Sequence, residues 1–311
     1  MGKKIDYRVR TAKYIERRML LDVFRKFNVF NNIEDYRYIG MGSIYFTDFI
    51  LFHKYLNISN MISLEKNEKE KERYLFNKPY HFIDVLFGLS SEIIEFAIDD
   101  NNNNIIWLDY DSFFEAKEVL GSIKKIIPKV KSGTFMAFSF NIQRNIEEQS
   151  EIEKFQTSIS SYVNLETKKA DFSKLNYPKT IQKVLNNYIE KKLNTLNASI
   201  NDVNEKLEYK PLIFMKYKDS VDMLTVGGIF VKSCDNEKYE SMNLKRDLDF
   251  VSFDDNVYCI DVPILTTKEI QLIDSEMIET SGKLKKILKE KIEKYKKIYR
   301  YYPHYVDSNI M

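Results

Sequence analysis

Cysteine, histidine and long apolar runs are scarce in this sequence. The two cysteines, Cys234 and Cys259, are too few for a disulfide framework or a multi-cysteine zinc module, and they favour a reduced, cytoplasmic chain. The three histidines, His53, His81 and His304, are not spaced as metal ligands, so we predict no metal site. No segment approaches the roughly 18 uninterrupted apolar residues of a membrane-spanning helix, and the first residues lack the apolar core of a secretory signal. We therefore expect a cytoplasmic protein without a membrane partner.

A strong net charge is also lacking. The 48 lysines and arginines nearly cancel the 46 acidic residues, which leaves a formal charge of +2. This balance does not favour a broadly basic nucleic-acid-binding surface, so a nucleic-acid partner is only weakly indicated. With 311 residues, of which 44% are hydrophobic and 30% charged, the chain is long enough for a large globular core.

Glycine is the third scarce residue. Only 9 of the 311 residues are glycines, about 3% against a usual share of about 7%. We therefore expect each glycine to be required by the backbone conformation at its position. Six of them fall where we expect strands to end or turn: Gly40, Gly42, Gly88, Gly133, Gly227 and Gly228.

The hydrophobic pattern predicts an N-terminal amphipathic helix and then alternating strands and helices. Apolar residues recur at helical spacing over 12–27. Five apolar strands separated by four helices follow, with the strands at 36–39, 61–64, 82–87, 105–108 and 134–140. This alternation predicts an α/β fold, namely a Rossmann-like, mostly parallel sheet with helices on both faces.

The remaining segments complete the expected organisation. Residues 143–204 are polar and helix-rich, either as a lid or as an ordinary crossover, and 212–217 and 223–231 are expected to form an antiparallel edge pair. A strand pair is expected near 250–262, followed by a helix over 281–299. We expect an N-terminal helical segment (1–35), a Rossmann-like domain with a helical insertion (36–231), and a C-terminal α+β extension ending in a helix (232–311).

Polar and glycine residues stand where the first two strands end. Gly40 and Gly42, followed by Ser43, would let backbone N–H groups approach a bound nucleotide or amino acid, although a tight turn without a ligand explains them equally well. Glu65 ends the next strand, 23 residues after Gly42, close to the spacing of about 20 at which an acid binds ribose hydroxyls. The alternative for Glu65 is a helix cap.

Two acids flank an aromatic residue at the end of the fourth strand. Asp109 and Asp111, on either side of Tyr110, could hold a substrate amine or act as a base, so these three are the candidate catalytic residues. Asp111 could instead cap a helix beginning near Ser112. In the first helix a basic group could steer an anionic substrate, but a solvated helix face is favoured for its members: Arg10, Lys13, Arg17 and Arg18.

These residues resemble the motifs of class I S-adenosylmethionine-dependent methyltransferases. Tyr38–Ser43 resembles the first motif, Glu65 the ribose-binding acid and Trp107–Asp111 the fourth motif, while 212–231 resembles the late antiparallel pair. The resemblance implies S-adenosylmethionine as the cofactor. Gly40, Gly42 and Ser43 would then contact its methionine part, Glu65 its ribose, and Asp109 the methionine part or the acceptor. The chain would be a divergent member of this superfamily, because Tyr38 stands where the family usually has an acid.

The acceptor is less defined than the cofactor. Methyltransferases acting on DNA amines carry two prolines in the fourth motif that this chain lacks, and Cys234 and Cys259 lie too far from the motifs for cytosine C5 chemistry. We therefore expect a small-molecule or nucleotide-like acceptor. The alternative is a catalytically silent Rossmann-like subunit that binds a nucleotide or a protein partner in a bacterial multi-gene system. A dinucleotide-dependent oxidoreductase is disfavoured, because Tyr45 occupies the third glycine position.

Overall fold

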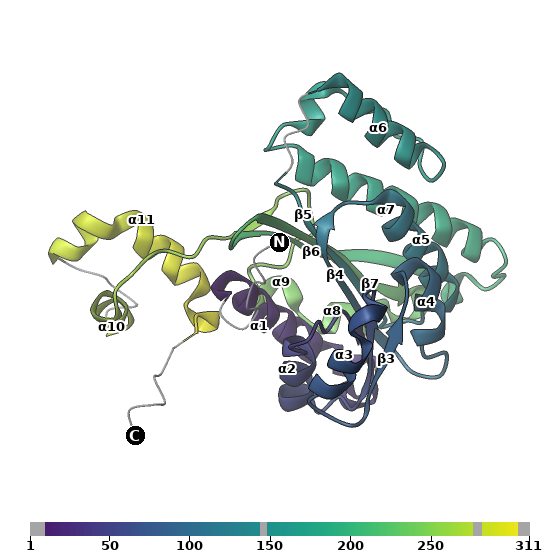
Figure 1. The fold of residues 1–311 in the computed structure, drawn as a ribbon, viewed down its shortest axis with the longest axis horizontal. Helices are drawn as coiled ribbons and strands as arrows, with labels where there is room; N and C mark the ends of the chain where they lie inside the picture. Colours follow the sequence, from purple (N-terminus) through teal and green to yellow (C-terminus); the bar gives the residue numbers. More distant parts are fainter. Residues whose placement is uncertain (1–9, 144–147, 276–281, 304–311) are drawn as a thin grey trace.

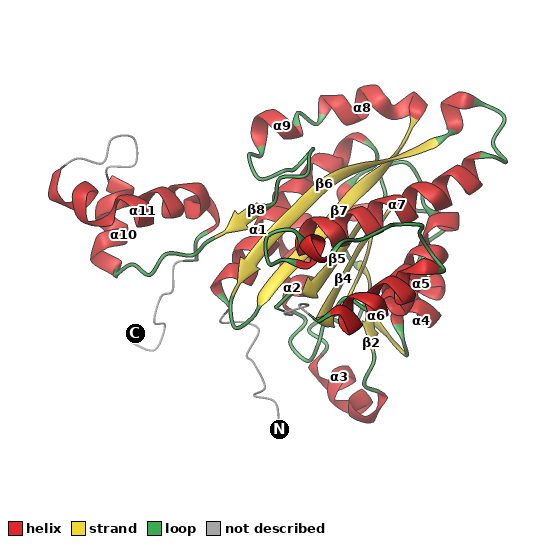
Figure 2. Ribbon diagram, turned by 90° about the horizontal axis from the view of Figure 1, so that it is seen from above, coloured by secondary structure: helices red, strands yellow, loops and turns green. Residues whose placement is uncertain are grey.

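The core of the protein is one twisted sheet with helices on both faces. The computed structural model describes residues 10–143, 148–275 and 282–303. In these residues the strand order is β3-β2-β1-β4-β5-β7-β6-β8, and β7 alone runs antiparallel to its neighbours (Figures 1 and 2). The strands are β1 (Arg37–Gly40), β2 (Asn60–Glu65), β3 (Ile83–Phe87), β4 (Asn104–Phe113), β5 (Phe135–Asn141), β6 (Leu207–Lys218), β7 (Asp222–Lys232) and β8 (Tyr258–Ile260). This confirms the predicted Rossmann-like fold.

Helices cover the two faces of the sheet in separate groups. One face carries α1 (Thr11–Arg25), α2 (Thr47–Leu56), α8 (Asn236–Ser241) and α9 (Leu244–Asp247). The other carries α4 (Ser90–Ala97), α5 (Ala116–Ile126), α6 (Gln149–Ser160) and α7 (Tyr177–Asn197). The short α3 (Lys71–Asn77) leads into β3, and α10 (Thr267–Ser275) and α11 (Gly282–Ile298) end the chain. Among the helices described, none is both long and apolar enough to cross a membrane.

Short 3-10 turns connect these elements. They are η2 (Lys26–Val29), η3 (Ile33–Asp35), η4 (Glu68–Glu70), η5 (Ile127–Lys129), η6 (Lys169–Phe172), η7 (Val203–Glu205), η8 (Ser233–Asp235) and η9 (Tyr299–Tyr301).

The strand sequences explain why the sheet is buried on both faces. Successive side chains of a strand point to opposite faces, so Tyr38 and Trp107 pack under α1 and α2 while Ile39 and Leu108 pack under α4 and α5. Both sets are apolar or aromatic, which is the pattern of a parallel sheet covered on two sides.

Three predicted boundaries are wrong. Strand β4 continues to Phe113, so Asp109, Tyr110 and Asp111 lie within it, and the following helix begins at Ala116, too late for Asp111 to cap it. The register with β5 shifts after Asp109, and the last residues of β4 are exposed and tolerate polar side chains.

The other two boundary errors concern the late strands. Residues 250–262 contain one strand, β8, where a pair was expected. The preceding residues form a turn in which the Ser252 hydroxyl donates to the Asn256 carbonyl. Because β8 pairs with β6, the antiparallel pair of β6 and β7 is not the edge of the sheet.

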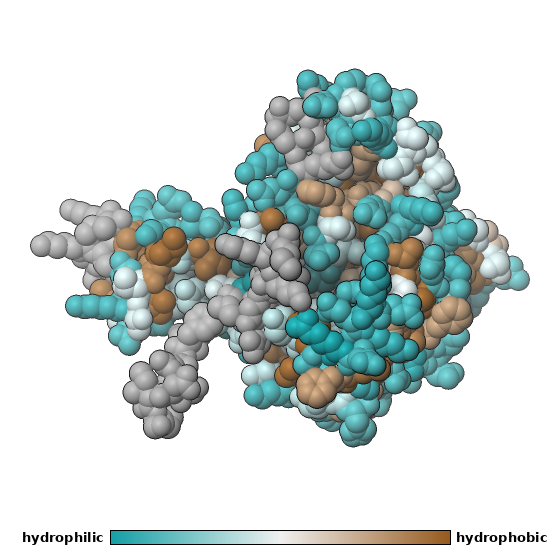
Figure 3. Space-filling model, viewed as in Figure 1, coloured by the Kyte–Doolittle hydropathy of each residue, from teal (hydrophilic) through white to brown (hydrophobic). Residues whose placement is uncertain are grey.

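The last two helices form a hairpin that projects from the sheet. Figure 1 shows α10 and α11 beside the main body, and Figure 3 shows apolar side chains gathered on this hairpin. Ile273, Leu288, Ile292 and Tyr295 form its own small core, separate from the two cores of the sheet. Of the helix predicted over 281–299, position 281 lies outside the described residues, and the backbone is non-helical at Leu288.

Gly227 and Gly228 lie inside β7 and mark no strand end, which corrects their predicted position. A Cβ at Gly227 would lie 2.5 Å from the Ala137 Cβ and 2.8 Å from the Met136 carbonyl oxygen, and one at Gly228 would lie 2.3 Å from the Lys210 carbonyl oxygen. Glycine is therefore required here by the close approach of β5 and β6 and not by a turn.

We expect Gly227→Ala to lower the free energy of unfolding by about 1–3 kcal/mol, because the new methyl group meets backbone that cannot move aside. Urea unfolding measures the loss. Gly121→Ala is the control, since its methyl group would meet the Ser91 side chain, at 3.0 Å from its Cβ, and no backbone atom, and alanine is favoured in a helix by about 1 kcal/mol. Equal effects of the two changes would contradict the packing argument.

Candidate functional site

A cavity of about 370 Å³ lies at the carboxyl ends of β1, β2 and β4. This volume is within the range of small-molecule sites, roughly 300–1,000 Å³. The structure brings six of the seven predicted site residues into its wall: Gly42, Ser43, Glu65, Asp109, Tyr110 and Asp111. Gly40 is not among the lining residues. A Cβ at Gly40 would lie 2.5 Å from the Tyr38 hydroxyl oxygen, so this glycine makes room for the Tyr38 ring.

The loop after β1 is tied to the end of β2 by hydrogen bonds. The Gly42 N–H donates to the Ser63 hydroxyl at 2.9 Å, and that hydroxyl donates to Glu65 Oε1 at 2.7 Å. Ser43 adopts the left-handed backbone conformation with φ 50°, and its N–H also reaches Glu65. The glycine turn and Glu65 therefore form one connected unit.

Glu65 is a buried acid in the cavity wall, with 6% of its surface exposed. Burial raises its pKa to about 7, although the hydrogen bonds from Ser63 and the Ser43 N–H favour the ionised form and oppose the shift. The nearby Tyr74 hydroxyl on α3 also favours the ionised form and opposes the rise of this pKa. The carboxyl group can therefore change its charge near neutral pH.

The three candidate catalytic residues of β4 differ in burial and in their partners. The side chain of Asp109 is 17% exposed, and its Oδ2 lies 2.8 Å from the Lys13 ammonium. Tyr110 points to the opposite face, where its hydroxyl lies 2.7 Å from the Ser90 hydroxyl and burial raises its pKa. Asp111 is exposed at the cavity mouth.

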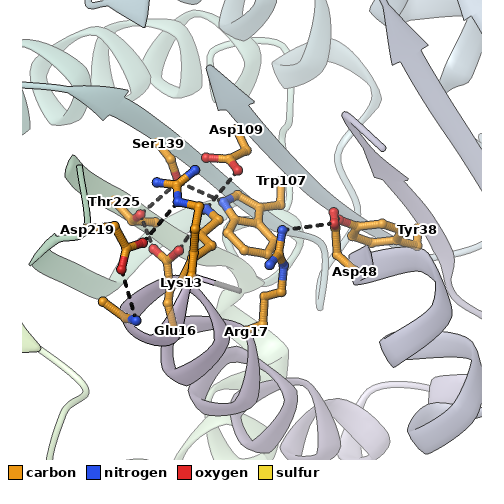
Figure 4. A network of polar contacts seen from close by, with 12 residues as sticks. Lys13, Glu16, Arg17, Tyr38, Asp48, Trp107, Asp109, Ser139, Asp219 and Thr225 are labelled. Atoms are coloured by element: carbon orange, nitrogen blue, oxygen red, sulfur yellow. Dashed lines mark hydrogen bonds and ion pairs between the residues drawn. The ribbon is translucent and has the colours of Figure 1, made fainter. Parts of the chain in front are cut away.

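Helix α1 places a row of cations against the carboxyl ends of the strands (Figure 4). Lys13 is fully buried, and its ammonium lies 2.8 Å from Glu16 and 4.2 Å from the centre of the Trp107 ring. Arg17 is 4% exposed and faces Asp48, while Arg10 pairs with Asp219 at 3.0 Å.

The predicted solvated face of this helix is therefore wrong. The signal was present in the spacing, because Lys13 and Arg17 continue the stripe of the buried Leu20 and Phe24 at steps of four, three and four residues. A charge on a buried stripe needs a partner, and that partner is Asp109 for Lys13.

The polar network continues from Glu16 into the sheet. Thr225 on β7 hydrogen-bonds the Glu16 carboxylate and lies 2.7 Å from the Ser139 hydroxyl on β5, which accepts from the Trp107 indole N–H at 2.9 Å. Burial raises the pKa of Glu16, and the Lys13 ammonium opposes that shift. Helix α1 is thus bound to the sheet by paired charges and hydrogen bonds as well as by apolar packing.

The cavity is acidic overall. Six carboxylates line it, and the two cations are Arg17 and Lys66. The carboxylates are Asp48, Glu65, Asp109, Asp111, Glu115 and Glu118. Such a wall favours a ligand that carries positive charge. Within the described ranges, no group of three or more histidine, cysteine or acidic side chains is placed to hold a metal ion.

Comparison with known proteins finds one family. The model of a family described as "Putative O-methyltransferase" matches residues 5–310. No curated protein matches the sequence. Among solved structures, cofactor-bound Rv0187 from MTB is 10% identical with a TM-score of 0.37, over 74% of this chain and 82% of that one. The fibrillarin pre-rRNA processing protein of Methanococcus jannaschii is 13% identical with a TM-score of 0.33, over 64% and 68%.

We expect Lys13→Met to lower the free energy of unfolding by about 3–5 kcal/mol, because Glu16 and Asp109 lose their shared cation. Adding Glu16→Gln should restore part of the loss, since one buried charge is then removed. Chemical denaturation measures both variants. Lys26→Met is the control, because Lys26 pairs with Asp247 in a more exposed setting and should cost less than about 1 kcal/mol. A Lys13 variant as stable as the Lys26 variant would contradict this assignment.

Proposed function

We propose an activity for this chain from one premise, which is that the chain belongs to the O-methyltransferase family whose model spans residues 5–310. The protein transfers the methyl group of S-adenosylmethionine to an oxygen atom of a small-molecule or nucleotide-like acceptor. The observation that carries the proposal is the acidic cavity, which joins the glycine turn, Glu65 and the acids of β4 in one wall.

The residues present fit this cofactor. S-adenosylmethionine carries a sulfonium cation, which an acidic wall stabilises. Its ribose hydroxyls are hydrogen-bond donors suited to the carboxylate of Glu65, and the turn at Gly42 and Ser43 would lie against the methionine part. When bound, the cofactor supplies the methyl group. Gly40 lies outside the wall and leaves room for the Tyr38 ring.

Asp109 and Asp111 of β4 have different roles toward the acceptor. Lys13 holds Oδ2 of Asp109, which leaves Oδ1 to orient an acceptor hydroxyl and to balance the sulfonium charge. Asp111 lies at the exposed mouth, where a carboxylate can take the acceptor proton and pass it to water. Tyr110 is buried and shapes the wall through its hydrogen bond to Ser90.

The small volume of the cavity and the negative charge of its wall support a small acceptor over a nucleic acid, because an acidic wall repels a phosphate backbone. The alternative is a catalytically silent subunit that binds the cofactor or a protein partner without methyl transfer. The acceptor screen with labelled S-adenosylmethionine distinguishes this subunit from an active enzyme. A bacterial origin and a cytoplasmic location stay predictions from the sequence.

We expect the affinity for S-adenosylhomocysteine to rise about tenfold between pH 6 and pH 8. Burial raises the pKa of Glu65 to about 7, and the ribose hydroxyls bind its ionised form. The unfolded chain loses this proton near the ordinary value of 4.5, so without ligand the free energy of unfolding falls as the pH rises from about 4.5 to 7. Calorimetric titration at three pH values measures the affinity.

Glu65→Gln is the matched variant. It should bind about tenfold to a hundredfold more weakly at pH 8 and lose the dependence on pH. A wild-type affinity that is the same at pH 6 and pH 8 would remove Glu65 from the ribose site.

We expect Asp109→Asn to slow single-turnover methyl transfer by about 10²–10⁴-fold, because the acceptor loses its orienting carboxylate. Acceptors come from an extract screen with isotopically labelled S-adenosylmethionine, and the chemical shift of the transferred methyl carbon shows whether it is bound to oxygen. Asp100→Asn, in the turn that precedes β4 and outside the cavity wall, is the control and should keep full turnover. Cofactor binding with no transfer to any acceptor would favour the silent subunit.

A further inference from the structure

Arg17 lies in the cavity wall and has unused hydrogen-bonding capacity. It is 4% exposed and lines the wall. Its Nη2 lies 3.6 Å from Asp48 Oδ1, longer than a hydrogen bond, and in the part of the chain that the structure describes its buried Nε has no hydrogen-bond partner. A buried guanidinium whose N–H donors lack acceptors destabilises the protein unless an anion accepts hydrogen bonds from it.

Asp48 is held in place independently of Arg17. The Tyr38 hydroxyl donates to Asp48 Oδ2 at 2.7 Å, and the carboxylate is 5% exposed at the cavity wall. Tyr38 occupies the position where the methyltransferase motif usually has an acid. The structure therefore supplies a carboxylate at this point from the start of α2, ten residues later in the chain.

A cation and an anion side by side match the amino-acid end of S-adenosylmethionine, which carries one carboxylate and one ammonium group. Arg17 and Asp48 line the same cavity as Gly42 and Ser43, the turn assigned to the methionine part. The second cation of the wall, Lys66, is unsuited because its side chain is 69% exposed. Arg17 presents a planar fork of donors that suits a carboxylate, and Asp48 can accept from the ammonium.

We propose that Arg17 and Asp48 bind the carboxylate and the ammonium of the cofactor's amino-acid end, and that Tyr38 is the positioning residue for Asp48. This inference rests on the proposed function. It assigns helix α1 a direct part in cofactor binding, and it explains how the chain tolerates a tyrosine in place of the acid of the first motif.

The test compares two ligands that differ only at this end. S-adenosylhomocysteine has the amino-acid group, whereas 5′-methylthioadenosine lacks it. Arg17→Met should weaken S-adenosylhomocysteine about tenfold to a hundredfold and change 5′-methylthioadenosine less than about twofold. Asp48→Asn should show the same selectivity, and Tyr38→Phe a smaller selective loss. Calorimetry gives the affinities, and thermal unfolding shows that each variant is folded.

Arg18→Met is the matched control. Arg18 is the next residue of α1 and stacks on the Tyr55 ring at 4.6 Å, outside the cavity wall, so both ligands should bind as in the wild type. If Arg17→Met does not fold, Arg17→Lys keeps the charge near Asp48 but loses the planar fork, and it should still weaken S-adenosylhomocysteine selectively.

The outcomes separate this inference from the proposed function. If the wild type binds neither ligand, both are wrong. If it binds both ligands with equal affinity, or if folded Arg17 variants weaken the two ligands equally or not at all, the proposed function stands and the role of Arg17 and Asp48 is wrong. Loss confined to S-adenosylhomocysteine supports the inference.

Discussion

The burial of helix α1 against the carboxyl ends of the strands is the constraint on which the site depends. Lys13 has no exposed surface, and its ammonium is shared between Glu16 on the same helix and Asp109 on β4. Both carboxylates gain from this shared cation, because a buried charge without a partner is strongly destabilising. The ion pair with Lys13 therefore ties the Asp109 side chain to α1, and Arg17 of the same helix forms part of the cavity wall.

The order of the strands places the cavity. Strands β1 and β4 are neighbours at the centre of the sheet, and the helices that follow them, α2 and α5, cover opposite faces. The two connections diverge and leave a crevice at the carboxyl ends, which is where open α/β sheets bind ligands. Gly42 and Asp109 come from these two strand ends and meet in one wall, although 67 residues separate them in the sequence.

The parts of the fold that local pattern determines were predictable, and those that depend on packing were not. Five strands, the late antiparallel pair and the strand-end position of Glu65 follow from apolar runs and glycine positions, and the structure confirms them. The family rested on the resemblance of Tyr38–Ser43, Glu65 and Trp107–Asp111 to known motifs, and the family match confirms it. The burial of Lys13 and Arg17 was not predicted, because their charge was given more weight than their place on the buried stripe of the helix. The extension of β4 beyond Leu108 was missed because acids usually end buried strands.

The three ion pairs along α1 differ in the distance between their charged groups. This difference distinguishes the two pairs that stabilise the fold from the pair that we assign to ligand binding. Arg10 lies 3.0 Å from Asp219 and Lys13 lies 2.8 Å from Asp109, so both pairs satisfy their charges within the protein and hold the helix on the sheet. Arg17 and Asp48 remain 3.6 Å apart, and Asp48 is anchored by Tyr38 instead. A buried ion pair without a direct hydrogen bond destabilises the free protein. A zwitterionic ligand that pairs with both charges would stabilise the protein on binding. One face of one helix thus anchors the fold at two positions, and its third cation, Arg17, lies in the cavity wall where the proposed cofactor would bind.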